Sequence, residues 1–108
     1  MKHQMIEGLI HQMKEHTEVE LELEGVSMTF EPRNCRFFCD PSNIGIQCGE
    51  TRIALEVDRA TLGWDTDRNG FKTFSGCLSG PFSEDFIFTL RPNKGCWLKN
   101  EINRMKEI

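Results

Sequence analysis

Residues 18–31, with the sequence EVELELEGVSMTFE, decide the fold of this chain. Glutamate and apolar residues alternate strictly from residue 18 to residue 24, which is the period of a strand with one buried face. A two-residue turn at 24–25 folds the stretch into a hairpin whose apolar residues all share one face: Leu23 opposite Val26, Leu21 opposite Met28, and Val19 opposite Phe30. A shift by one residue would destroy this sorting, so the register is well specified.

Two further hairpins follow from the same test. A turn at Gly49-Glu50 suits type II′, which places glycine first. Its apolar face would contain Ile46 opposite Ile53, Ile44 opposite Leu55, and Val57. A turn at Asn69-Gly70 predicts a third hairpin, because both residues tolerate a positive φ. It sets Asp67 opposite Lys72 and gives a shared face of Leu62, Trp64, Phe71 and Cys77.

The rest of the chain predicts turns, one more strand and two helices. Residues 40–43 and 58–61 are typical four-residue turns. Residues 85–90 are apolar on both faces, which predicts a strand that is central or lies under a helix. The spacing of Met5, Ile6, Leu9, Ile10 and Met13 predicts a helix over 2–16. Trp97, Leu98, Ile102 and Met105 predict another over 96–107.

These elements predict a single α+β domain over residues 1–108. Hairpins between neighbouring strands form an antiparallel β-meander. About six to eight short strands in a chain of 108 residues curl strongly or close into a small barrel. We expect one N-terminal and one C-terminal α-helix to cover one face or one mouth of that sheet.

Composition narrows the classes of function. The formal net charge is −4 and the sequence pI is about 5.4, which argues against a direct nucleic-acid binder. The sequence contains no apolar run long enough for a membrane span and no N-terminal secretory signal. An odd number of cysteines, five, then favours free thiols in a reducing compartment, so we expect a cytoplasmic protein.

Metal and catalytic motifs are weak. Residues 65–70 match the start of a calcium loop, but the twelfth position, where a bidentate Glu is needed, is Gly76. Cys35 and Cys39 have a spacing used by zinc sites, but in an extended strand they would lie about 13 Å apart. The three histidines (His3, His11 and His16) do not show the i, i+4 spacing of a metal pair, and no phosphate-binding or nucleophile-elbow motif is present. We therefore expect no cofactor, no metal and no enzymatic activity.

Charge layout gives the preferred function. Glu18, Glu20, Glu22 and Glu24 cluster on one hairpin, and residues 17–31 contain no Lys or Arg. An acidic face of this kind steers a basic partner into place. The sequence predicts a small acidic binding protein that docks on a basic protein surface, as inhibitor, immunity or phage-type antagonist proteins do by the same charge logic. The plainer alternative is an edge hairpin that charge keeps soluble.

Two other functions remain open. A curled sheet can enclose an apolar cavity for a small ligand, lined by Trp64, Phe71, Phe86, Phe88 and Trp97, although these residues can equally fill the core. Basic residues gather near the C-terminal end, at Arg91, Lys94, Lys99, Arg104 and Lys106. They could meet the acidic hairpin within one copy or between copies, so homo-oligomer formation is a further alternative.

Overall fold

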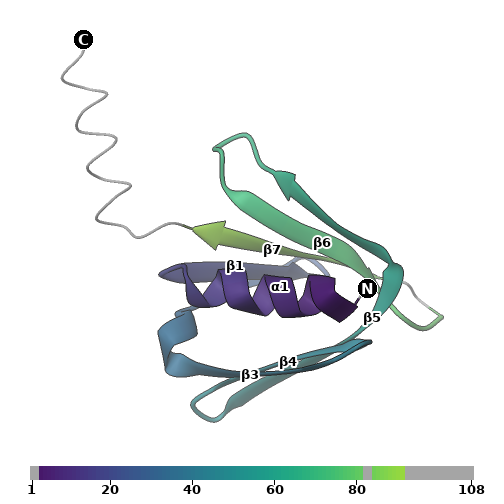
Figure 1. The fold of residues 1–108 in the computed structure, drawn as a ribbon, viewed down its shortest axis with the longest axis horizontal. Coiled ribbons are helices and arrows are strands. Elements are labelled where there is room, and N and C mark those ends of the chain that lie inside the picture. Colours follow the sequence, from purple (N-terminus) through teal and green to yellow (C-terminus); the bar gives the residue numbers. More distant parts are fainter. Residues whose placement is uncertain (1–2, 82–83, 92–108) are drawn as a thin grey trace.

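One helix and a seven-stranded antiparallel sheet make up the fold. The structure, a computed structural model, describes residues 3–81 and 84–91 (Figure 1). The elements, in chain order, are α1 (His3–Lys14), β1 (Glu18–Leu23), β2 (Val26–Phe30), the 3₁₀ turn η1 (Pro32–Asn34), β3 (Cys35–Asp40), β4 (Asn43–Cys48), β5 (Thr51–Thr66), β6 (Lys72–Leu78) and β7 (Asp85–Arg91). Their order across the sheet is β2-β1-β7-β6-β5-β4-β3.

The sheet curls into a half-barrel around α1. In Figure 1, β1, β7 and β6 lie on one side of the helix, β3 and β4 lie on the other, and β5 bends around to join them. The helix presents the predicted stripe to this concave side, and Ile6, Leu9 and Met13 are fully buried. An amphipathic helix has to bury one face, and a curled sheet gives it apolar side chains from several strands at once. The predicted N-terminal helix is therefore confirmed. The predicted C-terminal helix, 96–107, lies outside the described residues.

The decisive hairpin has the predicted register. Val19 lies opposite Phe30, Leu21 opposite Met28, and Leu23 opposite Val26. Glu24 and Gly25 both have positive φ, 54° and 78°, as a type I′ turn requires. The burial is uneven, however. Val26 is 62% exposed and Met28 is 38% exposed, because β2 is an edge strand of the sheet.

Two other predicted strand features are confirmed. The β4–β5 hairpin turns at Gly49, whose φ is 61°, and pairs Ile44 with Leu55 and Ile46 with Ile53. β7 is central, between β1 and β6. Its alternate residues Phe86, Phe88 and Leu90 are buried, whereas Ile87 and Thr89 on the other face are only half-buried.

The predicted register of the third hairpin was wrong by one residue. Lys72 lies opposite Thr66 rather than Asp67, and Trp64 lies opposite Phe74. The reason is the side chain of Asp67, whose Oδ1 accepts the backbone N–H groups of Asn69 and Phe71 at 2.8 and 2.9 Å. This bonding makes the loop longer than two residues. Phe71 then precedes β6, and Phe74 takes the fully buried position.

The segment 58–61 was predicted to be a turn between two strands, and this was also wrong. It is a corner within the single 16-residue strand β5. The local bonding is turn-like, since Asp58 Oδ1 accepts the N–H of Ala60 and the Thr61 hydroxyl donates to the Asp58 carbonyl at 2.6 Å. The pairing with β6 shifts between Asp58 and Gly63, which marks a bulge. This corner lets β5 pair with β4 at one end and with β6 at the other.

Candidate binding site: a cleft lined by carboxylates

The four predicted partner-binding glutamates lie on β1 and its turn but in different surroundings. Strand alternation places Glu18, Glu20 and Glu22 on the face opposite to the buried residues Val19 and Leu21. Glu18 and Glu20 are half-buried, whereas Glu22 and Glu24 are exposed. The predicted acidic face is thus divided into two ends along the strand.

One end is partly neutralised by β7. The guanidinium Nη2 of Arg91 lies 3.1 Å from Oε2 of Glu20, and both side chains are partly shielded from water. Glu18 lies opposite the same arginine in the β1–β7 register. Arg91 Nε is buried and has no partner among the described residues. Glu20 is therefore engaged within the fold.

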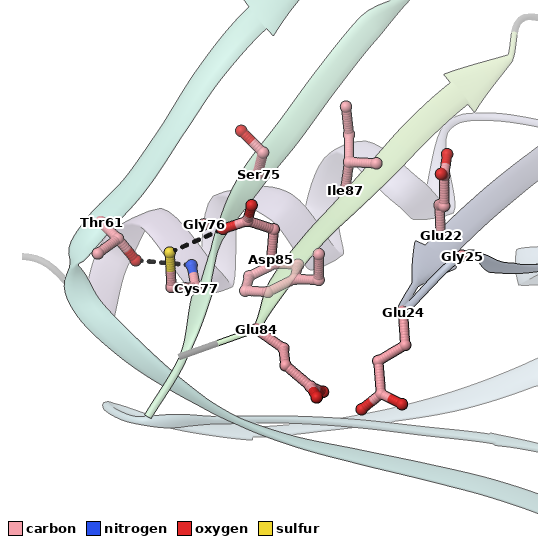
Figure 2. Close-up of a pocket in the computed structure, with 11 residues that line it drawn as sticks. Glu22, Glu24, Gly25, Thr61, Ser75, Gly76, Cys77, Glu84, Asp85 and Ile87 are labelled. Atoms are coloured by element: carbon pink, nitrogen blue, oxygen red, sulfur yellow. Dashed lines mark hydrogen bonds between the residues drawn. The ribbon is translucent and has the colours of Figure 1, made fainter. Parts of the chain in front are cut away.

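The other end opens into a cleft with four carboxylates. Glu22 and Glu24 line it together with Asp85, the first residue of β7, and Glu84 directly before it, and the volume of the cleft is about 720 Å³. Figure 2 shows Glu24 and Glu84 extending to the same side of the sheet. The other described lining residues are Gly25, Thr61, Ser75, Gly76, Cys77, Phe86 and Ile87. None of these described lining residues is Lys or Arg, so no basic side chain among them neutralises the carboxylates.

The inner wall of the cleft is fixed by a small hydrogen-bond network. The Cys77 thiol lies 3.1 Å from Asp85 Oδ1, and the Cys77 N–H donates to Thr61 Oγ1 at 2.8 Å (Figure 2). The hydrogen bond to Asp85, together with partial desolvation, raises the pKa of the Cys77 thiol. A thiol with a raised pKa is mostly protonated near neutral pH and is a poor nucleophile. The Cys77 thiol is therefore held as a hydrogen-bond donor to Asp85.

The metal sites considered from the sequence are not assembled within the described residues. Within residues 3–81 and 84–91, no three His, Cys, Asp or Glu side chains gather closely enough to hold a metal ion. In the calcium-like loop, Asp65 and Asp67 direct their Oδ1 atoms at neighbouring backbone N–H groups. No helix in the described residues is long and apolar enough to cross a membrane.

The aromatic residues proposed to line a ligand cavity are dispersed. Phe86 and Phe88 are almost fully buried and pack edge-on at 5.9 Å between ring centroids. Phe71 is half-buried in the β5–β6 loop, and Trp97 lies outside the described residues. Of the four described aromatic residues, only Trp64 borders a second cleft, separate from the one that Glu22 and Glu24 line. That cleft, about 530 Å³ between α1 and the β5–β6 hairpin, is also lined by Gly8, His11, Gln12, Asp65, Thr66 and Lys72.

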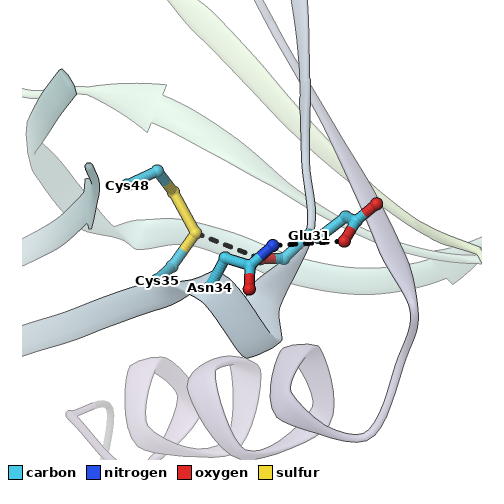
Figure 3. The surroundings of a disulfide bond; sticks show 4 residues. All are labelled: Glu31, Asn34, Cys35 and Cys48. Atoms are coloured by element: carbon cyan, nitrogen blue, oxygen red, sulfur yellow. Dashed lines mark hydrogen bonds between the residues drawn. A yellow bond between two sulfur atoms is a disulfide. The ribbon is translucent and has the colours of Figure 1, made fainter. Parts of the chain in front are cut away.

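A disulfide corrects the prediction that all five cysteines are free thiols. Cys35 and Cys48 lie directly opposite each other on β3 and β4 and are bonded, with their Cα atoms 4.4 Å apart (Figure 3). The short separation of a non-hydrogen-bonded antiparallel pair is what permits this bond. Cys39 is exposed and free. Disulfides are typical of oxidising compartments, so the cytoplasmic prediction loses the argument on which it rested.

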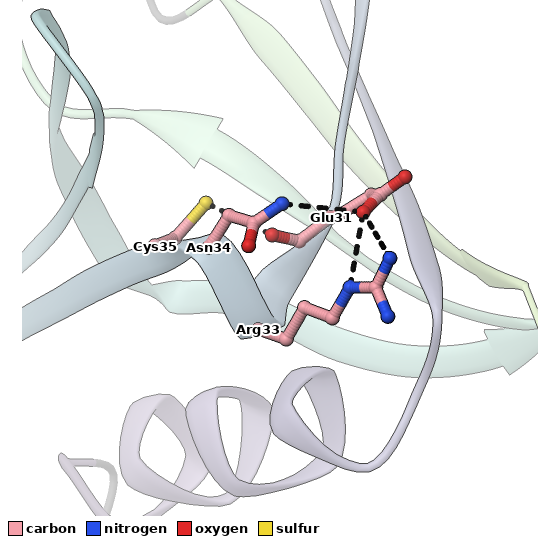
Figure 4. Close-up of polar contacts among 4 residues, drawn as sticks. All are labelled: Glu31, Arg33, Asn34 and Cys35. Atoms are coloured by element: carbon pink, nitrogen blue, oxygen red, sulfur yellow. Dashed lines mark hydrogen bonds and ion pairs between the residues drawn. The ribbon is translucent and has the colours of Figure 1, made fainter.

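The disulfide sits beside a compact polar cluster at η1. The Glu31 carboxylate pairs with Arg33 Nη2 at 3.1 Å and accepts the side-chain N–H of Asn34 at 3.2 Å (Figure 4). The Cys35 Sγ lies 3.3 Å from the Glu31 carbonyl oxygen (Figure 3). A disulfide sulfur carries no proton, so this is a contact, and only the reduced thiol can donate a hydrogen bond there.

Two carboxylates of the cleft, Glu84 and Asp85, were missed by the sequence reasoning. They reach Glu22 and Glu24 through the pairing of β1 with β7, two strands that are far apart in the chain. The nearest signal was the acidic pair itself, placed directly before a strongly apolar strand. No protein-family model, no curated protein and no solved structure matches this chain.

Proposed function

We propose that this chain is a non-enzymatic binding protein that docks its acidic cleft on a basic surface of a protein partner. The observation that carries the proposal is the gathering of Glu22, Glu24, Glu84 and Asp85 around one open cleft, with no cation among its described lining residues. Glu20, by contrast, already has a partner in Arg91. The cleft therefore gathers carboxylates that no basic side chain among its described lining residues neutralises.

Electrostatics favours a cationic occupant. Carboxylates that line a concave surface focus the negative potential there, which concentrates positive groups and speeds their association. A Lys or Arg side chain fits this chemistry, since its charged end can pair with the carboxylates while its apolar stem lies on the half-buried Ile87. Such contacts contribute mainly to association rate and specificity, as expected for an inhibitor or antagonist that finds its target through charge.

Charge reversal tests the proposal. Partners from a lysate of the source organism would be captured on the immobilised chain and identified, and binding would then be measured at about 50 mM and about 300 mM salt. We expect Glu22→Lys with Glu24→Lys to weaken binding by about tenfold or more, and affinity to fall with salt.

The matched control carries the same change in net charge elsewhere. Glu50 and Glu56 are exposed on the β4–β5 hairpin, away from the cleft. Glu50→Lys with Glu56→Lys should change the affinity by less than about threefold, the residual being a long-range effect. If both double variants lose the same affinity, general charge and not the cleft binds the partner. If the cleft variant binds normally, the proposal is wrong.

A second candidate function rests on the position of Trp64. The residue is 39% exposed and borders the cleft beside α1, and its ring packs edge-on against Phe74 at 5.0 Å between centroids. A small aromatic ligand could stack there, in line with the ligand-binding alternative. Quenching of tryptophan fluorescence by such a ligand, lost in Trp64→Phe, would support it. Quenching that persists in the variant would rule it out.

A further inference from the structure

The edge strand β2 is unusually accessible for a strand of its composition. Val26, Ser27, Met28 and Thr29 are all exposed, and the strand has no neighbour on its outer side among the described residues. Val26 and Met28 continue the apolar face of Leu23 and Leu21 beyond β1. The apolar face of the hairpin therefore extends onto β2, beyond the part that the core covers.

The backbone of β2 is also available. In a two-residue hairpin the pair flanking the turn, here Leu23 and Val26, exchanges both backbone hydrogen bonds, and bonded pairs then alternate. Ser27 and Thr29 fall at the non-bonded positions opposite Glu22 and Glu20. Their N–H and C=O groups therefore point away from β1, where another strand could pair with them.

The usual protection of an edge strand is missing from β2. Residues 26–30 include no charged residue and no proline, and the β1–β2 register runs without a shift that would mark a bulge. The opposite edge, β3, carries Arg36 and Asp40. Natural proteins normally blunt exposed edges with such charges, prolines or bulges, so an unprotected one indicates a place where a strand is received.

The charges beside β2 determine what kind of strand fits. Glu22 lies directly behind Ser27 on the outer face of the sheet, and the short serine side chain leaves a path to its carboxylate. A Lys or Arg placed opposite Ser27 can reach across to Glu22, while apolar residues before and after it meet Val26 and Met28. A second copy fits less well, because each chain carries a net charge of −4 and β2 is flanked by Glu24 and Glu31.

We propose that β2 receives an extended segment of the basic partner as an added strand, in which Lys or Arg alternates with apolar residues. This rests on the proposed function and names the mode of docking. Main-chain hydrogen bonds to Ser27 and Thr29 supply affinity in such strand addition, and the alternating side chains supply specificity. The basic face of the segment lies toward Glu22 and continues into the acidic cleft.

The first test uses defined peptides on the unmodified chain of residues 1–108. An eight-residue peptide that alternates Lys and Val would be compared, by fluorescence anisotropy, with two others of equal charge. One has its four Lys and four Val in separate blocks, and the other is N-methylated at alternate residues on its pairing edge. We expect both controls to bind about tenfold more weakly, because each loses main-chain bonds or the alternation that the edge requires. Equal binding of all three peptides, or no binding of the alternating one, would overturn strand addition.

The second test changes the edge itself. Ser27→Pro removes an outward N–H without touching the bonds to β1, whereas Ser27→Ala keeps it. We expect Ser27→Pro to weaken binding of the alternating peptide by about tenfold and Ser27→Ala by less than twofold. Thermal unfolding of both variants shows whether the hairpin is retained. If the proline variant is unfolded, the comparison of the N-methylated and unmodified peptides decides.

Hydrogen exchange gives an independent measurement. The amides of Ser27 and Thr29 should exchange rapidly in the free chain and become protected when the alternating peptide binds. Protection already present in the free chain would mean that another segment or a second copy covers the edge, and the proposal would be wrong. Peptide binding that is lost on reversal of Glu22 and Glu24 but unaffected by Ser27→Pro and by N-methylation would leave the proposed function standing and refute strand addition alone.

Discussion

Removing the disulfide between β3 and β4 should lower the stability of the fold substantially. Cys35 and Cys48 are 13 positions apart in the sequence, and the bond closes the whole β3–β4 hairpin. In the chain-entropy account, a loop of about 15 residues loses enough freedom in the unfolded state to stabilise the native state by about 3 kcal/mol. Domains of ordinary stability have about 5–15 kcal/mol in total, so the loss would be a large fraction.

Urea unfolding measures this loss. The unmodified chain and the variant Cys35→Ser with Cys48→Ser would be unfolded with and without reductant, followed by circular dichroism. We expect reductant to lower the free energy of unfolding of the unmodified chain by about 3 kcal/mol, which shifts the midpoint by about 1–3 M urea. Reductant should leave the double-serine variant unchanged, which separates this bond from effects on the other cysteines.

Two results would refute the reasoning. Alkylation of the denatured, unreduced chain with five labels would show that the bond does not form at all. A bond that is present but contributes less than about 0.5 kcal/mol would show that the reduced chain keeps the hairpin ordered in its unfolded state, so that closure removes little entropy.

Three other perturbations test the packing and the titrating groups. Gly76→Ala should destabilise the fold by about 1–3 kcal/mol in urea unfolding. A Cβ at this position would lie 3.1 Å from Thr61 Oγ1, which two hydrogen bonds hold in place. An unchanged stability would mean that the β5 corner moves freely to make room. Asp85→Asn should lower the pKa of the Cys77 thiol, because the hydrogen-bonded carboxylate that raises this pKa is lost. The thiol should then be alkylated faster near pH 8, as measured by mass spectrometry. A slower reaction would contradict the contact between Asp85 and Cys77. The pKa of Asp40 is lowered by the Ser42 backbone N–H and then by the Asn43 amide. Its contribution to stability is therefore present above the ordinary carboxyl pKa of about 4 and lost as the pH falls through the lower folded value, and Asp40→Asn should remove that acid dependence. An NMR titration that gives Asp40 an ordinary pKa would contradict this.

Much of the sheet could be predicted from the sequence because most of its strands pair with their neighbours in the chain. The glutamate alternation around residues 18–24 fixed the first register, and Gly49 located the second turn. The third register failed because a side chain, that of Asp67, set the length of the loop. The general preference of Asn-Gly for two-residue turns reflects backbone conformation alone and takes no account of hydrogen bonds from a neighbouring side chain.

The disulfide was within reach of the same reasoning. The turn at Pro41-Ser42 sets Asp40 opposite Asn43, and counting outward along both strands places Cys35 opposite Cys48. Cys35 and Cys48 are equally far from this turn, and this symmetry predicts the disulfide better than the odd total number of cysteines does.

The candidate site could be predicted only in part, for a topological reason. Glu22 and Glu24 were identified from the local pattern. Their neighbours Glu84 and Asp85 lie directly before β7 and at its first position, and the arginine that pairs with Glu20 ends β7. This strand pairs with β1 although the two are far apart in the chain. Rules for hairpins describe neighbouring strands, and no local signal in β1 indicates which distant strand will lie beside it.

The pairing of β1 with β7 has a consequence for how the chain folds. β1 is synthesised early but gains its second neighbour only after β7 has emerged, so closure of this contact must overcome the entropy of a long intervening chain. Until then the first hairpin is a two-stranded ribbon, which is marginally stable and has both edges open to other nascent chains. Its glutamates then act as gatekeepers against aggregation. Replacing Glu18 and Glu22 with Gln should therefore lower the yield of refolding at high protein concentration more than it lowers the stability of the finished fold.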